Sequence, residues 1–557
     1  MNKHETKHRG VRRTAIGAAA FALCAGICGG AAAIDVDTGN DELQVRFDNT
    51  VRYNFGRRVE AQNPAILANA NVDDGDRNFG KGATVSNRVD LLTEFDVIYL
   101  KKFGARVSAA SWYDRAYAGR FDNASLATSN HVVNGVPALG LSPYATRYAR
   151  GGSGEWLDAF VFGALDLGDM PLTVRAGRHT VNWGEGLLSG GAIHGNGYAQ
   201  APLDLAKALA LPGIEAKELY RPQTQLSAQL QATNELSFAG QYFLRWDATR
   251  APEAGTYLGY ADHLLNGGEA LIAGPGVRAL RGPNIEPKER GDWGLAARWS
   301  PEWLDGTLGF YVRNFSDKLP QVILKAAPPL RYYLNYADDI DLYGISLAKQ
   351  IAGISFGADL NYRRNMPLIS DSTITITSLA ALPAQGDSIG ARGNTLHGVL
   401  NAIGAAGATP VFHSASWAAE LTWNRYTSVT QGAQFFKGRA SYTAMDKVSK
   451  DYLGIALNFT PTWYQVFPGA DLSMPASYSR GLSGNSAVTS GGNKGAGSYA
   501  IGLGLDLYQK YRFDLRYVDY FGRYASNPVT GALTVPNGTQ ALLEDRGAIY
   551  LTFKTTF

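Results

Sequence analysis

The chain ends with the stretch Gly547-Ala-Ile-Tyr-Leu-Thr-Phe-Lys-Thr-Thr-Phe557. In steps of two, Ile549, Leu551 and Phe553 fall on one side of this stretch, and the residues between them, including Lys554, fall on the other. This alternation has the period of a half-buried β-strand. The stretch therefore predicts a strand, and a protein built on it needs partner strands of the same kind.

The same alternation recurs along the whole chain. In Glu42–Phe55 and Asn87–Tyr99 apolar residues alternate with charged residues. Pairs of such segments flank short turns, for example at Gly168-Asp169 and Gln509-Lys510, whereas the next pair follows only after a long segment such as Thr180–Pro222. Short turns at one end and long loops at the other are the plan of outer-membrane barrels, and a closing strand with a terminal Phe resembles their recognition signal. The sequence predicts an all-β fold, a transmembrane antiparallel up-and-down β-barrel with long extracellular loops.

The number of strands follows from their directions. If both ends of the chain lie on the periplasmic side, the number must be even. The direction of successive strands stays consistent only if a further strand lies near Asn394–Ile403 and turns at Thr409-Pro410. Leu396, Val399 and Leu400 in that segment also fit a helix. We expect about eighteen strands, with about sixteen as the alternative.

The N-terminus has the pattern of an export signal. Basic residues precede an apolar run from Thr14 to Ala33 that ends in three alanines, which predicts a cleaved signal peptide over residues 1–33 and one barrel domain over residues 34–557. Cys24 and Cys28, the two cysteines of the chain, fall inside this signal. The exported chain would therefore have no disulfide and no thiolate metal site.

The composition excludes several classes of protein. The formal charge is +3, and residues 1–33 contribute five basic residues and one acidic residue, so the remaining chain carries −1. This balance gives no indication of nucleic-acid binding. After the signal, no stretch approaches the ~20 apolar residues of a membrane helix. Abundant glycine and tyrosine, with 18% charged residues, are typical of strands, turns and aromatic girdles.

The charged side of each strand is predicted to face the lumen, because a charge on the lipid face costs ~2–4 kcal/mol at the bilayer midplane. The mixture of signs argues against a simple anion or cation pore. The predicted lumenal residues are Arg46, Arg52, Arg88, Asp90, Glu94, Asp96, Arg106, Asp114, Arg175, Arg245, Arg298, Asp359, Arg363, Glu420, Asp506, Arg512, Asp514 and Arg516.

The third long loop, Thr180–Pro222, is unlike a solvated loop. Its first part is rich in glycine, and its second part has Pro202, Asp204 and Pro212-Gly213 at the positions that start and stop a short helix. One interpretation is that it folds inward as a constriction or plug; the other is that it caps the barrel from outside. Arg178, Asn182 and Glu185 are predicted to fix it to the wall. The full set of predicted constriction residues is Arg178, His179, Asn182, Trp183, Glu185, Asp204, Glu215, Lys217 and Glu218.

Two further motifs resemble functional sites only in part. Gly353-Ile-Ser-Phe-Gly357 matches the nucleophile elbow of hydrolases, but here it opens an alternating strand and not a strand-to-helix turn. The acidic segment Asp73–Asn78 has oxygen ligands but lacks the complete loop pattern and terminal Glu of a calcium site, so a network of Asx turns is preferred. We expect no catalytic residue, metal or cofactor.

Four segments resemble the outer-membrane barrel family catalogued as domain-of-unknown-function 1302. They are Asp74–Phe79, Ser86–Asp96, Ala176–Glu185 and Pro212–Glu218. The resemblance spans the mature chain and carries no settled chemistry. It implies a genetic setting beside an RND-type transporter and a periplasmic partner. It thereby implies traffic of hydrophobic molecules such as lipids, steroids or hydrocarbons, with cargo and direction unsettled.

Two functions remain open from the sequence. The first is a channel or transport port for small, hydrophobic molecules, working with a periplasmic lipid-binding partner and an RND-type transporter. The second is a permanently plugged docking or structural barrel of an envelope assembly. In either case the expected partners include outer-membrane lipids and the barrel-assembly machinery, which would bind the closing strand at Phe557.

Overall fold

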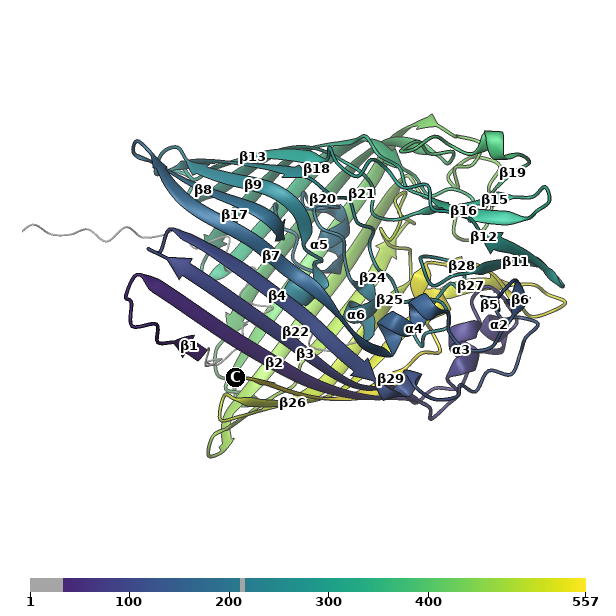
Figure 1. The fold of residues 1–557 in the computed structure, drawn as a ribbon, viewed down its shortest axis with the longest axis horizontal. Coiled ribbons are helices and arrows are strands. Elements are labelled where there is room, and N and C mark those ends of the chain that lie inside the picture. Colours follow the sequence, from purple (N-terminus) through teal and green to yellow (C-terminus); the bar gives the residue numbers. More distant parts are fainter. Residues whose placement is uncertain (1–33, 211–215) are drawn as a thin grey trace, which may run out of the picture.

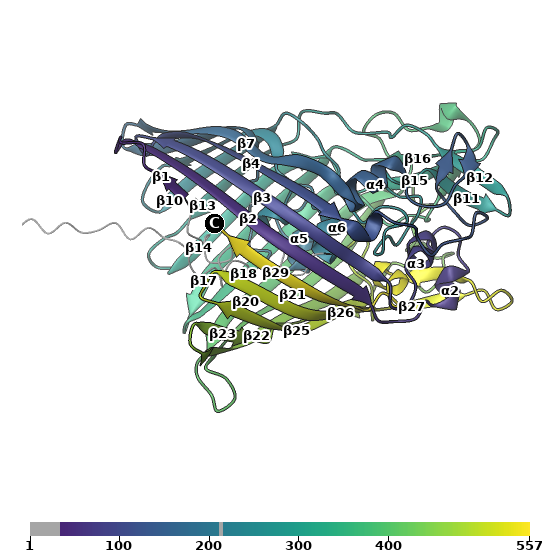
Figure 2. The same ribbon diagram turned by 60° about the horizontal axis from the view of Figure 1, so that its bottom comes forward.

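The computed structural model describes residues 34–210 and 216–557, so the predicted signal over residues 1–33 lies outside the described residues. One antiparallel sheet closes on itself (Figures 1 and 2). The first wall strand, β2 (Leu43–Arg58), pairs with its neighbour β3 (Thr84–Tyr99) and also with the last strand, β29 (Ala548–Thr556). The predicted closing strand therefore completes the barrel.

The wall has eighteen strands, as the sequence predicts, and the alternative of sixteen is excluded. The short strand β1 (Ile34–Val36) pairs with the start of β2, and β23 (Ala470–Ser473) and β24 (Ala476–Ser483) share one position beside β22. The other wall strands are β4 (Phe103–Asp114), β7 (Gly151–Leu167), β8 (Met170–His179), β9 (Gln223–Gln231), β10 (Leu236–Phe243), β13 (Trp293–Trp299), β14 (Gly306–Phe315), β17 (Ile340–Ile351), β18 (Ile354–Pro367), β20 (Arg392–Ala406), β21 (Ser414–Gln431), β22 (Asp451–Phe467), β25 (Gly497–Leu507) and β26 (Tyr511–Phe521).

The segment Asn394–Ile403, which fitted both a strand and a helix, belongs to β20. Val399 on this strand is buried, whereas the next residue, Leu400, is 52% exposed. This alternation places successive side chains on opposite faces of a strand. The strand predicted for this segment is therefore confirmed, and Leu396 and Leu400, which also fitted a helix, lie on the outer face.

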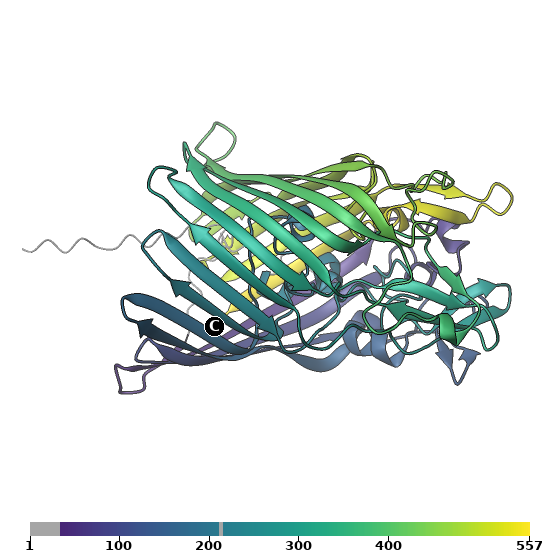
Figure 3. The same ribbon diagram turned by 90° about the horizontal axis from the view of Figure 1, so that it is seen from above.

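The connections differ at the two ends of the barrel. Tight turns such as the one at Leu100 and Lys101, both with positive φ, join strands at one end. At the other end the long connections build an extracellular cap (Figures 1 and 3). Three of them contribute to a five-stranded sheet: β11 (Ala270–Gly274), β12 (Val277–Arg281), β15 (Gln321–Lys325), β16 (Arg331–Asn335) and β19 (Ile374–Ile376). Smaller cap elements are α2 (Pro64–Leu67), α3 (Asp74–Asn78), η1 (Arg115–Tyr117), β5 (Val132–Val133), β6 (Val136–Pro137), α4 (Pro143–Ala149), η2 (Leu379–Ala381), β27 (Arg523–Ser526), β28 (Leu533–Asn537) and η3 (Thr539–Leu542).

The two faces of the wall have opposite chemistry. On β29 the outward residues Ile549 and Leu551 are 43% and 46% exposed, whereas Tyr550 and Thr552 between them are buried. Exposed apolar side chains of this kind recur on the outer face of nearly every wall strand. Such a surface is stable against hydrocarbon, and the closed ladder leaves no backbone edge in lipid. Within residues 34–210 and 216–557, no helix has the length and apolar character to cross a membrane.

The wall strands have very unequal lengths. β10 and β13 have 8 and 7 residues, whereas β21 and β22 have 18 and 17. A tilted strand needs ~9–11 residues to cross the hydrocarbon layer. On the side of β10 and β13 the hydrogen-bonded ladder is therefore short.

The third long loop folds inward, as predicted. Residues 180–222, called the plug loop below, connect β8 to β9 and contain α5 (Ser189–His194), α6 (Leu205–Ala210) and α7 (Ala216–Leu219). Figures 1 and 2 show α5 and α6 inside the barrel. The carboxylate of Asp204 accepts the N–H of Lys207 at 3.0 Å, so it caps α6 as the sequence suggests.

Candidate functional site

The first half of the plug loop is bound by a single carboxylate of the wall. Glu420 on β21 accepts hydrogen bonds from the N–H groups of Leu187 at 2.7 Å, Leu188 at 3.0 Å and Gly191 at 2.7 Å. Glu420 is only 1% exposed. A β-carbon on Gly191 would collide with its carboxylate. The glycine-rich sequence thus allows the main chain to approach a buried anion.

A second carboxylate holds the same part of the loop from β18. Asp359 accepts the N–H of Glu185 with Oδ1 and the N–H of Asn196 with Oδ2, both at 3.0 Å. The side-chain amide of Asn196 donates at 2.9 Å to the carbonyl of Ile345 on β17. The two ends of this lobe are therefore fixed to neighbouring strands.

Two buried arginines bind the carbonyl groups of the same lobe. Arg363 on β18 donates through Nη2 to the carbonyls of Ile193 at 2.9 Å and Gly195 at 3.1 Å. Arg313 on β14 donates through Nη1 to the carbonyls of Asn196 at 3.0 Å and Tyr198 at 2.7 Å. The wall thus supplies anions for the N–H groups of the loop and cations for its carbonyls, with strength typical of charge-assisted hydrogen bonds.

The second half of the plug loop is bound to the opposite side of the lumen. Glu155 on β7 accepts hydrogen bonds from Lys207 and Arg250, both at 2.9 Å. Arg250 also donates to Asp204 at 2.7 Å. Glu218 forms an ion pair with Arg52 on β2. The loop therefore crosses the lumen, from β17–β21 on one side to β2–β7 on the other.

An apolar cluster lies between the two halves. Trp183 is buried, and its main-chain N–H donates to the side-chain oxygen of Gln200 at 2.8 Å. Its ring lies 6.1 Å from that of Tyr311 on β14. The indole lies directly against Gly294 of β13, where a β-carbon would collide with it. Trp183 therefore packs against the short side of the wall.

The predicted constriction residues do not form one cluster. Asn182 and Trp183 line a cavity of about 30 Å³ inside the plug loop, and the main chain of Glu185 binds Asp359. His179 lies on the inner face of β8, where Nε2 contacts Ser227 Oγ at 2.7 Å. Glu215 lies outside the described residues, as does the side chain of Lys217.

Arg178 departs from its prediction as a residue that fixes the loop to the wall. It pairs in register with Ala159 and Thr224, on the same face as the outward Val161 and Leu226. No hydrogen bond or ion pair joins it to another described residue, and its Nε is buried without a partner. The reason is the strand period: Arg175, three residues earlier, points inward, so Arg178 must point outward.

Several predicted lumenal charges form ion pairs along the wall. Arg88 contacts Asp90 at 2.6 Å, Arg46 contacts Asp48 at 2.9 Å, and Arg512 contacts Asp514 at 3.0 Å. Further pairs join Arg106 to Glu94, Asp96 and Asp158, and Arg175 lies over the ring of Phe160. Arg516 forms no ion pair with any residue that the structure describes, and its Nε is buried without a partner.

Sequence reasoning missed how the loop is held. Glu420 and Arg363 were expected in the lumen, but not as ligands of the loop main chain, and Arg313 was not singled out at all. The sequence pattern could have predicted that Arg313 faces the lumen, since this residue alternates with the outward Val312 and Phe310 on β14. The lumen was thus predictable, and the residues that bind the loop were not.

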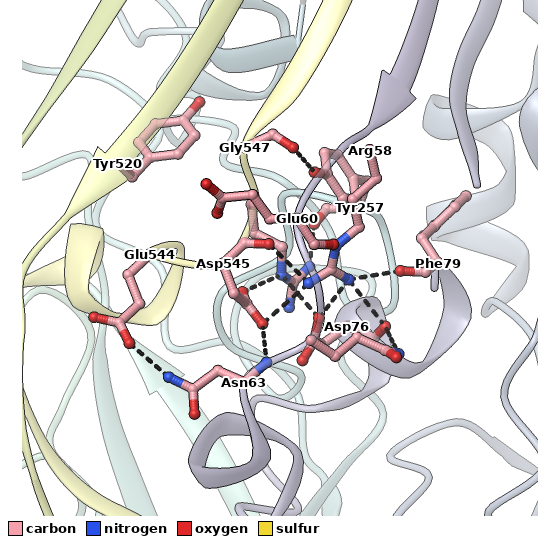
Figure 4. A network of polar contacts seen from close by, with 12 residues as sticks. Arg58, Glu60, Asn63, Asp76, Phe79, Tyr257, Tyr520, Glu544, Asp545 and Gly547 are labelled. Atoms are coloured by element: carbon pink, nitrogen blue, oxygen red, sulfur yellow. Dashed lines mark hydrogen bonds and ion pairs between the residues drawn. The ribbon is translucent and has the colours of Figure 1, made fainter. Parts of the chain in front are cut away.

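A second buried charge network ties the extracellular cap to the seam between β2 and β29 (Figure 4). Arg58 at the end of β2 donates to Asp76 at 2.6 Å and contacts Asp545 at 3.0 Å, and Arg546 contacts both carboxylates. Burial raises the pKa of Asp76 to about 6 despite these two arginines. We call these four residues the seam cluster. Within the acidic segment Asp73–Asn78, residues Asp74–Asn78 form α3, in place of the expected network of Asx turns.

Two further carboxyl groups of the cap are buried and form no ion pair with any cation that the structure describes. Asp262 accepts the N–H groups of Asp74 at 3.0 Å and Gly255 at 3.3 Å. Burial, with repulsion from Asp73, raises the pKa of Asp262 to about 7. Burial likewise raises the pKa of Glu253 to about 7. The cap therefore contains groups that titrate close to neutral pH.

A family model described as "Protein of unknown function (DUF1302)" matches residues 14–557. No curated protein matches this chain. Among solved structures, OccD3 (OpdP) of Pseudomonas aeruginosa has 11% identity over 95% of this chain and 93% of its own, with a TM-score of 0.39. OccAB3 of Acinetobacter baumannii has 10% identity over 92% of this chain and 99% of its own, with a TM-score of 0.40.

Proposed function

We propose that this chain, which belongs to the DUF1302 family, is an outer-membrane transport port that its plug loop closes at rest. The port passes small, hydrophobic molecules when the loop moves. The observation that carries the proposal is the way the loop is held, by buried charges of the wall that bind its main chain. Such a loop blocks the lumen without being part of the wall.

The chemistry of the loop supports a movable closure. Wall side chains bind the peptide groups of its lobe from Glu185 to Tyr198. The side chains of His194, Asn196 and Tyr198 add further contacts. Release of the lobe would leave the wall ladder intact, because no backbone hydrogen bond joins the lobe to a wall strand in the part of the chain that the structure describes. The barrel can therefore change from closed to open with its strands unchanged, as order–disorder switches do in other proteins.

The hydrophobic cargo and the partners extend the proposal beyond the geometry. Family resemblance favours cargo of the lipid, steroid or hydrocarbon type, delivered by a periplasmic lipid-binding partner and an RND-type transporter. A partner that engages the periplasmic end would supply the free energy that releases the lobe. Exported proteins of this class reach the outer membrane with a cleaved signal peptide, and residues 1–33 fit that role.

The second candidate is a permanently plugged docking barrel. The number of contacts to the plug loop favours this candidate. Three wall strands hold its lobe, through Glu420, Asp359, Arg313 and Arg363. In this case the barrel would serve as a fixed outer-membrane station of an envelope assembly.

Conductance in planar bilayers separates the two candidates. Glu420→Ala leaves three buried N–H groups without an acceptor, at ~1–3 kcal/mol each, so the closed state should lose on the order of 3 kcal/mol or more. The variant should show steady open conductance, whereas wild type stays closed. Glu235→Ala, which removes an exposed glutamate from a short turn, is the matched control. If Glu420→Ala remains as silent as the control, with the barrel intact by gel mobility, the docking barrel replaces the transport port.

A further inference from the structure

A cavity lies beneath the plug loop, on the side of the short turns. It has a volume of about 190 Å³ and is lined by Leu187 and Leu188 of the plug loop and by the inner face of β21 to β26. The polar part of its wall comes from Asn458, Thr460, Ser477 and Arg516. We call this cavity the vestibule. Ser416 and Ala418, near the periplasmic start of β21, complete its floor.

The vestibule contains a lumenal arginine that lacks an ion-pair partner among the described residues. Arg516 lies on the inner face of β26, in register with Gly502 and Tyr550. Its Nε is buried without a partner, and it forms no ion pair with any described residue. The nearest carboxylate along its strand, Asp514, is bonded to Arg512.

An unpaired guanidinium in a partly buried site favours the arrival of an anion. Arginine presents a planar fork of donors that matches a carboxylate or a phosphate. A charge that is partly removed from water without a partner is unfavourable, and a bound anion removes this penalty. The amide of Asn458 and the hydroxyl groups of Thr460 and Ser477 provide further hydrogen bonds around the same place.

Part of the vestibule wall is apolar. Leu187 and Leu188 of the plug loop are partly exposed and line the cavity with Ala418 and Pro475. An alkyl chain that covers these side chains would be stabilised by the hydrophobic effect. The volume is below the ~300–1,000 Å³ of sites that enclose a drug-sized ligand. It therefore fits a head group and the start of one chain, with the rest of the chain in the open lumen.

We infer that the vestibule binds a single-chain amphiphile with an anionic head, the head on Arg516 and the chain on Leu187 and Leu188. This inference deepens the proposed function and rests on it only for the meaning of the ligand as cargo. The N–H groups of the same two leucines are bound to Glu420. A chain packed on these leucines therefore touches the part of the plug loop that must move.

Binding of a dansyl-labelled undecanoate tests the inference. The whole barrel is placed in nanodiscs of zwitterionic phosphatidylcholine, and empty nanodiscs give the background. Loss of the charge-assisted hydrogen bonds in Arg516→Gln should raise Kd about tenfold or more. Arg46→Gln removes a paired lumenal arginine from β2 and should change Kd less than about twofold. The methyl ester of the probe should bind wild type as weakly as the acid binds Arg516→Gln.

The competitors and variants define what would overturn the inference. Decyl phosphate should displace the probe at concentrations where inorganic phosphate does not, since the chain contributes to binding. Equal displacement by inorganic phosphate would identify a site for a free anion and overturn the amphiphile. Wild-type affinity in Arg516→Gln would overturn the site itself. If the probe binds as expected while Glu420→Ala shows no conductance in bilayers, the proposed transport port is wrong and the binding site remains. If Glu420→Ala conducts but the probe does not bind as expected, only the inferred binding site is wrong.

Discussion

The plug loop and the extracellular cap are both held by buried charges, but in different ways. In the plug loop, wall side chains such as Glu420 and Arg363 bind peptide groups of the loop. In the cap, side chains bind side chains, as Arg58 and Arg546 bind Asp76 and Asp545. This difference indicates which residues keep each region in place. The plug loop depends on residues outside it, whereas the cap depends on the ionisation of its own residues.

The largest expected effect is in the cap. Arg58→Ala leaves the buried Asp76 and Asp545 with Arg546 alone, and loss of one partner of a buried ion pair costs ~3–5 kcal/mol. The temperature at which the barrel loses its compact gel mobility should fall clearly. Arg57→Ala, at the neighbouring exposed arginine, is the control and should leave this temperature unchanged. Equal behaviour of the two variants would show that the seam cluster does not stabilise the barrel.

A smaller effect is expected in the plug loop. Asp359→Ala leaves the N–H groups of Glu185 and Asn196 without an acceptor, at a cost on the order of 2 kcal/mol. Hydrogen exchange should become faster in the lobe between these residues, while the melting temperature of the barrel stays as in wild type. Asp341→Ala, on the neighbouring strand and paired with an exposed arginine, is the control. A lower melting temperature with unchanged exchange in the lobe would contradict a separately held loop.

The cap should respond to pH. The folded pKa of Asp262 is about 7, above its ordinary value of 3.8, so the folded cap prefers the protonated acid. Its contribution to stability is complete below the ordinary pKa and is lost as pH rises to about 7, by up to ~1.4 kcal/mol per pH unit. Hydrogen exchange over residues 253–262, corrected for its intrinsic pH dependence, should reveal this loss. In Asp262→Asn the pH dependence should flatten; an unchanged slope would assign it to Glu253 or Asp76.

The smallest effect is expected at Arg178. Because Arg178 lies on the outer face and binds no described residue, Arg178→Ala should leave conductance and exchange in the plug loop as in wild type. Glu185→Ala should behave similarly, since Asp359 binds its main-chain N–H and not its carboxylate. Open conductance in Arg178→Ala would show that Arg178 does help to hold the plug loop.

The sequence predicted the wall because the wall is a local pattern. Each strand must present apolar residues to lipid and polar residues to the lumen, so a period of two appears in every segment and parity settles the number. The helix α6 was predictable for a similar reason, since Asp204 caps it within one turn. The five-stranded sheet of the cap was missed, because its short strands come from three separate loops.

The contacts that hold the plug loop could not be predicted from local sequence patterns. Leu187 binds a carboxylate 233 positions further along the chain, and no feature of either segment encodes the pairing. The error at Arg178 is of another kind. The spacing from Arg175 already placed these two arginines on opposite faces of a strand, and the expectation of a polar cluster took precedence over that period.

The unequal strands have a consequence for the surrounding lipid. A bilayer of constant thickness cannot match a ladder of 7 residues at β13 and one of 18 at β21 on the same molecule. The acyl layer must compress beside β10 and β13, or the barrel axis must lean toward them, at a cost of fractions of a kcal/mol per Å. Either way, lipid disorder concentrates along one flank, the flank against which Trp183 packs from within.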